Sequence, residues 1–494
     1  MKVGSFLLLL AIIMLMSCNH GEQTARRVCA GCHLFPEPSL LPADIWDRHV
    51  LPQMALRLGI TSEVGNRKLS PQEAALVPEK PLVSRAEWKA IRQYYLSQAP
   101  AHLTDSVFVP VSGNIGSLFY IQQVQLPAEK PASISSIRID TAVHQLYAAD
   151  AVNNCVWYID ATGVPVSAYN PGGAVITDMQ LAGGQVLETS IGTSLNPTPE
   201  KVGTVSRRGL QSGRRGDVLL QRLYRPVHTL EYDLDGDDLK ELITCEFGVD
   251  DGKLSVWRNC NGRYEEVVLY RAPGAVRIAV TDMNADGMPD ILCLFGQGNE
   301  QLRWFENKGH FSFASHLLLR FPPVYGSTDF ALADMDGDGR QDIIYTCGDN
   351  ADFSPVLKPY HGICIYHNNG RQSFSLCTFL PQNGATQAVA RDFDGDGDTD
   401  IATIAYFPDT SAIQQDEFRL YLNNNGHFAT LSNHLGNLGR WLVMDAADID
   451  GDGDCDIALG SYPMMMMAPG GYRREWQQGP GVVLLINKRM AANH

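Results

Sequence analysis

The pattern of hydrophobic and polar positions divides the chain into three segments. Residues 6–16 form an unbroken apolar run. Residues 84–100 place apolar side chains at helical spacing, which predicts an amphipathic helix. From about residue 112 onward, short apolar stretches alternate with turn residues, which predicts strands. The pattern therefore predicts a leader, a helical segment and a long β region.

The apolar run near the N-terminus is too short for a membrane span, because a transmembrane helix needs about 20 apolar residues. The basic Lys2 precedes it, so the run is typical of a secretory signal. It ends in LMSC, which resembles a bacterial lipoprotein signal over residues 1–18 and implies lipidation of Cys18. An ordinary signal peptide with a chance cysteine is the alternative. We therefore expect an exported protein, lipid-anchored to a bacterial cell-envelope membrane on its periplasmic or cell-surface side.

The segment from residue 22 to about 104 has the composition and spacing of a small helical domain. A first helix is expected before the pair of cysteines at its start. Ser84 and Glu87 form a capping box that predicts the start of a later helix, and Pro100 predicts its end. One face of that helix carries Trp88, Ile91, Tyr95 and Leu96.

Cys29, Cys32 and His33 have the spacing C-x-x-C-H. In an exported protein this spacing indicates covalent attachment of a c-type haem. The two cysteines would form thioethers and His33 would be the axial ligand of the iron. A zinc site commonly takes four ligands from two such pairs, and the sequence has no second pair. The segment 22–104 resembles the cytochrome c family, which implies one covalent haem c and transfer of single electrons.

The second axial ligand is left open between two residues. Met54 follows Pro52 closely, and a methionine beside a proline in a loop is how the distal ligand occurs in many cytochromes c. Methionine ligation would raise the potential of the iron. His49 is the alternative axial ligand. The other alternative is that Met54 fills the hydrophobic core and does not bind the iron.

Net charge and cysteine usage narrow the function further. The formal net charge of −16 argues against a nucleic-acid partner. Three of the 11 cysteines are assigned to lipid and haem, and the other eight lie mostly in apolar, strand-like runs. Buried free thiols are common in strands, and export also permits disulfides, so their state stays open.

Five acidic segments recur with spacings of 49 to 58 residues, starting at Asp233, Asp282, Asp334, Asp392 and Asp448. Oxygen-bearing side chains stand at positions 1, 3, 5 and 9 of each, which predicts a Ca²⁺ loop and four to five bound ions. EF-hands are excluded, because position 12 is never Glu and a strand follows. Acidic turns without metal are the alternative. The predicted ligands are Asp233, Asp235, Asp237, Glu241, Asp282, Asn284, Asp286, Asp290, Asp334, Asp336, Asp338, Asp342, Asp392, Asp394, Asp396, Asp400, Asp448, Asp450, Asp452 and Asp456.

The first loop is expected to be the weakest site. Asp238 replaces the usual turn glycine there, and Glu241 replaces the aspartate at position 9.

Each acidic loop is followed by strand-like runs, one of which ends in Asn and Gly as a hairpin turn does. Four strands per unit of about 50 residues are typical of a propeller blade. These units resemble FG-GAP, or VCBS-type, repeats over residues 227–490, the family that includes the integrin α-subunit propeller. Two units without metal loops precede them within 112–226, so we expect seven blades over 112–490, with six or eight left open. The predicted fold is a small all-α cytochrome c-like domain followed by an all-β propeller.

In blades of this kind the metal loops and the Asn-Gly turns lie on one face, and the loops after the second strand lie on the other. The latter are long here, and function concentrates on such loops. Candidate residues on this face are Glu246, Asp349, Asp352, Lys358, His361 and Trp476.

Three functions remain open from the sequence. The first is a membrane-anchored electron-transfer protein whose calcium-stabilised propeller docks a redox partner of the cell envelope, or a ligand. The second is a haem-coupled oxidoreductase with its substrate on the long-loop face. The third is a binding or adhesion propeller, for a polysaccharide or protein, in which the haem is secondary. The whole chain resembles lipoprotein-anchored VCBS-repeat cytochromes, which favours the first.

Overall fold

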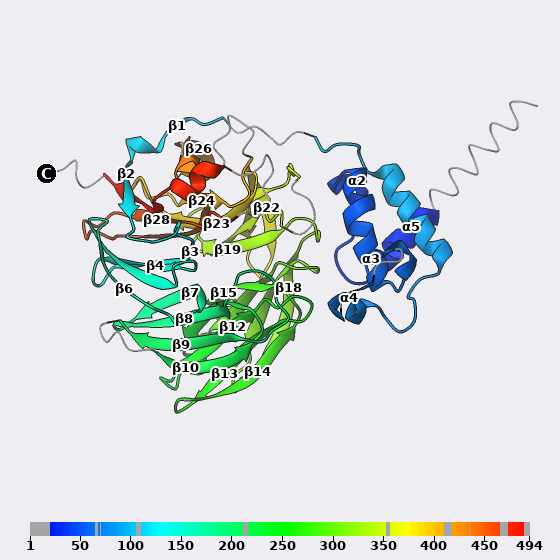
Figure 1. The fold of residues 1–494 in the computed structure, drawn as a ribbon, viewed down its shortest axis with the longest axis horizontal. Helices are drawn as coiled ribbons and strands as arrows, with labels where there is room; N and C mark the ends of the chain where they lie inside the picture. The colour runs from blue at the N-terminus through cyan, green and yellow to red at the C-terminus, as the bar shows by residue number, and fades with distance from the viewer. Residues whose placement is uncertain are drawn as a thin grey trace, which may run out of the picture. The chain divides into compact units, whose positions relative to one another are not determined.

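The computed structural model describes residues 20–64, 68–69, 71–104, 110–210, 216–351, 356–409, 417–433, 435–464 and 473–488. The predicted signal, Cys18 and Asp352 lie outside these residues. The chain divides into two compact units, a helical unit within the first 106 residues and a β unit that holds the sheets (Figure 1).

The helical unit contains no strand among its described residues. A helix over residues 20–29 comes first. It is followed by η1 (Pro38–Leu40), α2 (Ala43–Ile45), η2 (Trp46–Val50), α3 (Leu51–Arg57), η3 (Thr61–Val64), α4 (Pro71–Leu76) and α5 (Arg85–Gln98). The predicted capping box is present at α5, where Ser84 and Glu87 exchange side-chain and backbone hydrogen bonds. The unit is therefore helical as expected, with short helices around the longer α5.

The first helix and α5 approach closely at Gly21. A Cβ atom at Gly21 would stand 3.1 Å from the carbonyl oxygen of Ala90 and 3.3 Å from Cβ of Tyr94, which is tighter than ordinary van der Waals contact. The core nearby is aromatic, with the rings of Trp46 and Tyr95 4.6 Å apart. Glycine at position 21 therefore lets the helix that leads to the cysteines lie against α5.

The β unit is a seven-bladed propeller, so the predicted blade number is confirmed. Blade 1 contains β3 (Ile134–Asp140), β4 (Gln145–Asp150), β5 (Cys155–Asp160) and β6 (Pro165–Tyr169). Blade 2 contains β7 (Val175–Ala182), β8 (Gln185–Gly192), β9 (Gly203–Gly209) and β10 (Asp217–Leu223). Blade 3 contains β11 (Pro226–Tyr232), β12 (Glu241–Glu246), β13 (Lys253–Cys260) and β14 (Arg263–Arg271).

The remaining blades follow the same order of strands. Blade 4 contains β15 (Ala275–Thr281), β16 (Asp290–Phe295), β17 (Gln301–Asn307) and β18 (Phe313–Arg320). Blade 5 contains β19 (Ser327–Ala333), β20 (Asp342–Cys347), β21 (Gly362–Asn368) and β22 (Phe374–Pro381). Blade 6 contains β23 (Ala385–Arg391), β24 (Asp400–Ala405), β25 (Phe418–Asn424) and β26 (His427–Ser432), and blade 7 contains β27 (Trp441–Ala447), β28 (Asp456–Ser461) and β29 (Gly481–Asn487).

The ring is closed by strands that precede blade 1 in sequence. β2 (Phe119–Gln125) is the outermost strand of blade 7 and pairs antiparallel with β29 along its whole length. The short β1 (Gly113–Asn114) adds to β26 of blade 6 in parallel. The two blades without metal loops thus begin at β3, and residues 113–125 belong to the last two blades.

Polar side chains on the innermost strands join each blade to the next. Arg138 of blade 1 donates to Asp178 of blade 2 at 2.7 Å. Four side chains accept backbone N–H groups of a following inner strand, in the pairs Asp178 with Thr229, His228 with Ile278, Gln387 with Met444, and Asp445 with Ile139. The blades are therefore held together near the axis by hydrogen bonds as well as by apolar packing.

Candidate functional site

The five acidic loops lie where the sequence placed them. Each joins the first and second strands of a blade, from blade 3 to blade 7. Position 9 of each loop is the first residue of the second strand and is buried. Position 2 is an apolar side chain, which is buried in four of the five loops, at Leu234, Met335, Phe393 and Ile449. These two anchors hold the exposed acidic residues between them.

Two positions in each loop have left-handed backbone geometry. At position 4 φ is +76° for Gly236 and +59° for Ala285, and at position 6 it is +83° for Gly339 and +67° for Asp238. Glycine adopts this geometry at little cost, whereas a residue with a Cβ is strained there. This explains the repeated glycines, and it makes Asp238 and Ala285 the two costly residues.

Backbone N–H groups of each loop fix the carboxylates. In the third loop, Asp334 accepts from the N–H groups of Gly337 and Gly339, both at 2.8 Å. Asp338 accepts from the N–H of Arg340 at 2.8 Å. The same bonds from position 7 to position 5 recur in the other loops. The carboxylates are thus held in place by the backbone of the loop itself.

The carboxylate at position 9 receives a backbone N–H on each oxygen. One comes from position 2 of its own loop and one from an asparagine that ends the third strand, as for Asp456 with Ile449 and Asn487, both at 2.8 to 2.9 Å. Burial raises the pKa of Asp456 to about 7 and that of Asp400 to about 6. A carboxylate oxygen has two lone pairs, so each oxygen keeps one for a cation.

An asparagine stands at the end of each third strand, or one residue before it, and does more than mark the turn that its sequence pattern predicts. The Nδ2 group of Asn307 donates to the carbonyl of Pro289 in its own loop and to that of Leu234 in the preceding blade, at 3.1 and 3.0 Å. Its Oδ1 accepts from the N–H of Gly309. We call this residue the blade latch, which is Asn259, Asn307, Asn368, Asn423 and Asn487 in the successive blades.

The loops bring three carboxylates together at recurring positions. In loops 1, 4 and 5, ligand atoms of positions 1, 3 and 9 all lie within 4.8 Å of one another. Those groups are Asp233, Asp235 and Glu241; Asp392, Asp394 and Asp400; and Asp448, Asp450 and Asp456. The arrangement of hard oxygens suits Ca²⁺. In loop 2 the amide of Asn284 instead donates to Asp286 and Glu306.

The cysteine motif lies at the end of the first helix. Cys29 is the last residue of that helix, and Cys32 and His33 follow in the turn. The ten cysteines that the structure describes are all free thiols, Cys29 and Cys32 included. Burial raises the pKa of the Cys29 thiol to about 11, and this thiol interacts with the Tyr95 hydroxyl of α5. The two thiols are therefore available for thioether bonds.

The orientation of His33 suits a metal ligand. Its Nδ1 lies 2.9 Å from the carbonyl oxygen of Leu34. With Nδ1–H as donor, Nε2 is the unprotonated nitrogen, which is the one that binds a metal. The buried Nε1–H of Trp88 in α5 has no partner among the described residues. Two thiols and an imidazole are the donor set that a c-type haem takes.

Met54 lies in a helix, so its predicted place in a loop is wrong. It is the fourth residue of α3 (Leu51–Arg57), and Pro52 stands in the first turn of that helix. Proline is tolerated there because the first N–H groups of a helix have no intrahelical partner. His49, the alternative ligand, is exposed in the π-helical turn η2. Axial ligation by either residue stays a prediction.

Two of the long-loop candidates have structural roles. Glu246 is buried, pairs with Lys253 at 3.2 Å and accepts the N–H of Tyr224. Trp476 is buried and donates its indole N–H to the carbonyl of Gly436 at 2.8 Å. Lys358 and His361 are also buried, and Asp349 is half-buried.

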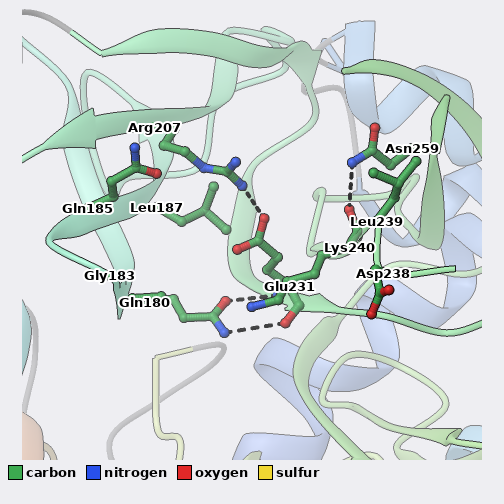
Figure 2. Close-up of a pocket in the computed structure, with 11 residues that line it drawn as sticks. Gln180, Gly183, Gln185, Leu187, Arg207, Glu231, Asp238, Leu239, Lys240 and Asn259 are labelled. Atoms are coloured by element: carbon green, nitrogen blue, oxygen red, sulfur yellow. Dashed lines mark hydrogen bonds and ion pairs between the residues drawn. The ribbon is translucent and has the colours of Figure 1, made fainter. Parts of the chain in front are cut away.

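A cavity of about 560 Å³ lies between blades 2 and 3. Figure 2 shows its lining, in which Arg207 and Glu231 form an ion pair and Gln180 exchanges two hydrogen bonds with the backbone of Glu231. Asp238 and Lys240 of the first acidic loop border it. Between its first and second strands, blade 2 has only the short Gly183–Gly184 turn, whereas blade 3 has the first acidic loop. Residues of both blades line the cavity. Its size and mixed polarity suit a small polar ligand.

Comparison with known proteins agrees with the repeat assignment. A family model described as an FG-GAP-like repeat matches residues 233–293 and 282–345, which include the first three acidic loops. The match supports FG-GAP repeats in this propeller. No curated protein matches the chain.

Similar solved structures include the N-terminal domain of Nup159 and a chain from the Saccharomyces cerevisiae complex of Dbp5 with Nup159, Gle1, IP6 and ADP. They are 12% and 10% identical, each match covers 78% of this chain and 98% of the other, and both have a TM-score of 0.43. A likeness of that size carries no conclusion about this protein.

Within the part of the chain that the structure describes, no helix has the length and apolar character needed to cross a bilayer.

Proposed function

We propose that this protein is an exported, lipid-anchored electron-transfer protein. A haem c on the helical unit carries single electrons, and the FG-GAP propeller is the platform that binds a partner. One observation carries the proposal: two cysteines that form no disulfide and a histidine, whose Nδ1 lies 2.9 Å from the Leu34 carbonyl oxygen, stand together in C-x-x-C-H at the end of a helix. Cys29 and Cys32 would hold the haem, and His33 would ligate its iron. The group supplies reversible one-electron chemistry when bound.

The remaining residues of the motif region have positioning roles in this proposal. Arg26 pairs with Glu22 and Glu37, and Arg27 pairs with Glu87 of α5. Tyr95 donates to the carbonyl of Pro36 at 2.9 Å. These bonds tie both sides of the C-x-x-C-H turn to the helices, so the turn is held rigid. Rigid positioning lowers the structural rearrangement that accompanies a change of charge.

The test is expression of the full chain with c-type maturation. Wild type should carry one covalent haem, visible as a haem-stained band in a denaturing gel and as sharp α and β absorption bands on reduction. Cys29→Ala with Cys32→Ala should lose it, while Cys260→Ala, a matched change of a half-buried propeller thiol, should keep it. Wild type without covalent haem would end the electron-transfer proposal. Met54→Ala and His49→Ala, compared by spectrum and potential, identify the second axial ligand.

Calcium in the acidic loops is the second part of the proposal. Each loop concentrates three to five carboxylates, whose mutual repulsion a divalent cation would relieve. A ligand that binds only the folded state stabilises it by RT ln(1 + [L]/Kd), so millimolar Ca²⁺ should raise the melting temperature and chelator should lower it. Equal melting temperatures in both conditions would contradict calcium binding.

A binding role for the propeller is favoured by the cavity between blades 2 and 3. Its lining combines the Arg207–Glu231 pair with the amides of Gln180, Gln185 and Asn259, which suits a polyhydroxylated ligand such as a saccharide. Screening oligosaccharides against wild type and Arg207→Ala tests this. A saccharide that binds both variants equally does not use the cavity.

A further inference from the structure

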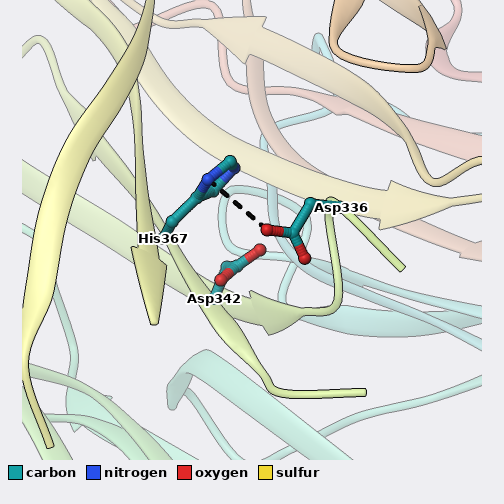
Figure 3. Close-up of side chains that lie close together, drawn as sticks. All are labelled: Asp336, Asp342 and His367. Carbon is teal, nitrogen blue, oxygen red and sulfur yellow. Dashed lines mark ion pairs between the residues drawn. The ribbon is translucent and has the colours of Figure 1, made fainter. Parts of the chain in front are cut away.

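The third acidic loop differs from the other loops in how its side chains are arranged. Loops 1, 4 and 5 gather positions 1, 3 and 9. In the third loop, position 3 is shared between two groups, one with Asp334 and Asp338 and the other with Asp342 and His367. Figure 3 shows the second group, in which Asp336, Asp342 and His367 face one another. It is the one loop group of the described residues that contains a nitrogen donor.

The position of His367 is fixed by the strand that carries it. His367 precedes the blade latch Asn368 on β21, and the N–H of Asn368 donates to Asp342 at 2.8 Å. The imidazole and the position-9 carboxylate are therefore tied to the same point of the sheet. Asp342 also accepts the N–H of Met335 at 3.0 Å, so its orientation is set from two sides.

The distance between the donors matches a small cation. Nδ1 of His367 lies 3.5 Å from a carboxylate oxygen of Asp336. Two ligands of a tetrahedral Zn²⁺, each about 2.0–2.1 Å from the ion, lie roughly 3.4 Å apart. His367 and Asp336 are therefore spaced for such an ion, and Asp342 offers an oxygen within 4.8 Å of both donors.

Position 5 of this loop is already paired. The guanidinium of Arg340 forms an ion pair with Asp338 and donates to the carbonyl of Asn368 at 2.8 Å. A cation in the loop would have to compete with Arg340 for Asp338. The donors outside that pair include the two carboxylates and the imidazole of the His367 group.

The other blades have no imidazole at this place. The residues before their blade latches are Arg258, Glu306, Leu422 and Ile486. Imidazole suits zinc and other first-row transition metals, whereas Ca²⁺ prefers oxygen ligands alone. Among the five residues that precede the blade latches, His367 is therefore the one that offers an imidazole.

We propose that Asp336, Asp342 and His367 form a site for a borderline transition-metal dication such as Zn²⁺, distinct in its metal preference from the calcium loops. The inference rests on the proposed cation-binding role of the acidic loops. It assigns the third loop a different metal from the calcium proposed for the others. Water, or a side chain of a protein bound to the propeller, would complete the coordination shell of the ion.

The test uses the full chain, stripped with chelator and equilibrated with buffered Zn²⁺ in the presence of millimolar Ca²⁺. Wild type is compared with His367→Asn, which replaces the nitrogen by an amide oxygen. His427→Asn changes an exposed histidine outside every carboxylate group of the described residues, and is the control. Bound zinc and calcium are counted by elemental mass spectrometry, and X-ray absorption at the zinc edge reports imidazole ligation.

We expect His367→Asn to lose one equivalent of zinc, or to bind it at least about tenfold more weakly, without any loss of calcium. The control should bind zinc as wild type does. Equal zinc content and imidazole signal in wild type and His367→Asn would overturn the inference, even if calcium fills the loops. If zinc depends on His367 but no loop binds calcium, this site stands and the calcium proposal falls.

Discussion

At the scale of single residues, backbone geometry explains most of the composition of the acidic loops. Positions 4 and 6 have positive φ in every loop, and glycine occupies all but two of these places. Asp238 and Ala285 are the exceptions, with φ of +67° and +59°. Both lie in the loops that depart furthest from the repeated sequence. The predicted weakness of the first loop therefore has a conformational cause as well as a chemical one.

Replacing Asp238 with glycine should stabilise the protein. The change relieves left-handed strain of about 1–2 kcal/mol and loses part of that gain to the flexibility of unfolded glycine, for a net gain of about 0.5–1 kcal/mol. Urea denaturation with chelator present measures it apart from any metal. The matched change Gly453→Ala, where a Cβ meets no atom within 4 Å, should destabilise by about 1 kcal/mol. A loss of stability in Asp238→Gly would contradict this account.

His228 makes stability depend on pH. Burial lowers its pKa to about 3, with Arg277 and Arg138 adding to the effect and Asp178 opposing it. In the unfolded state this histidine has a pKa near 6.5. Between about pH 6.5 and pH 3 the unfolded state therefore binds a proton that the folded state does not bind. This contribution to stability is complete above about pH 6.5 and is lost as pH falls, by up to about 1.4 kcal/mol per pH unit.

The variant His228→Asn isolates this effect, because an asparagine Oδ1 can still accept the N–H of Ile278. The free energy of unfolding, measured by denaturant at several pH values, should fall less steeply in the variant than in wild type. Parallel curves would show that another group controls the acid response.

At the scale of elements, the blade latch couples each metal loop to the hairpin beside it, and Asn307, Asn423 and Asn487 also bond to the preceding blade. The bond from Asn307 to Leu234 crosses from blade 4 to blade 3, and that from Asn487 to Phe393 crosses from blade 7 to blade 6. Sequence spacing could place the loops, because their ligands are local. It could not reveal the latch, because the partners of one asparagine lie in other strands and another blade.

Asn307→Ala should destabilise the propeller by about 2–4 kcal/mol, because it leaves several buried backbone groups without partners. Asn259→Ala is the matched control. Asn259 donates to Lys240 of its own loop and caps the Gly262 turn, and the preceding blade has no metal loop for it to join. We expect a cost about half as large, measured by chemical denaturation. Equal costs would show that the bond between blades contributes nothing.

The helical elements show where local patterns mislead. The capping box gave the start of α5 correctly, because cap and partner are three residues apart. Pro52 suggested a loop, yet it stands in the first turn of α3. A proline can mark either the end of a helix or its first turn. The surrounding packing decides which of the two occurs.

At the scale of the whole molecule, the repeat pattern predicted the number of blades but not how the ring closes. Periodicity is visible within one blade and between neighbours. β2 and β29 lie at opposite ends of the propeller sequence, so no local sequence pattern predicts that they pair. Phe119 of β2 is buried in the core of blades 6 and 7, with its ring 6.2 Å from that of Phe393.

Phe119→Ala should therefore destabilise the closed ring by about 3–5 kcal/mol. Tyr120→Ala on the same strand removes a ring that is 61% exposed, and should cost less than about 1 kcal/mol. Thermal unfolding followed by circular dichroism compares the two. If both changes cost the same, closure does not depend on the inward face of β2.

The closing pair also bears on how the protein is made. β2 is synthesised before any complete blade, and β29 is the last strand of the propeller to be synthesised. An interrupted chain therefore keeps β2 as an unpaired edge, which invites aggregation and proteolysis. Contacts of such high sequence separation also form slowly. Only a chain translated through its final strand can therefore cover that edge of β2 with β29.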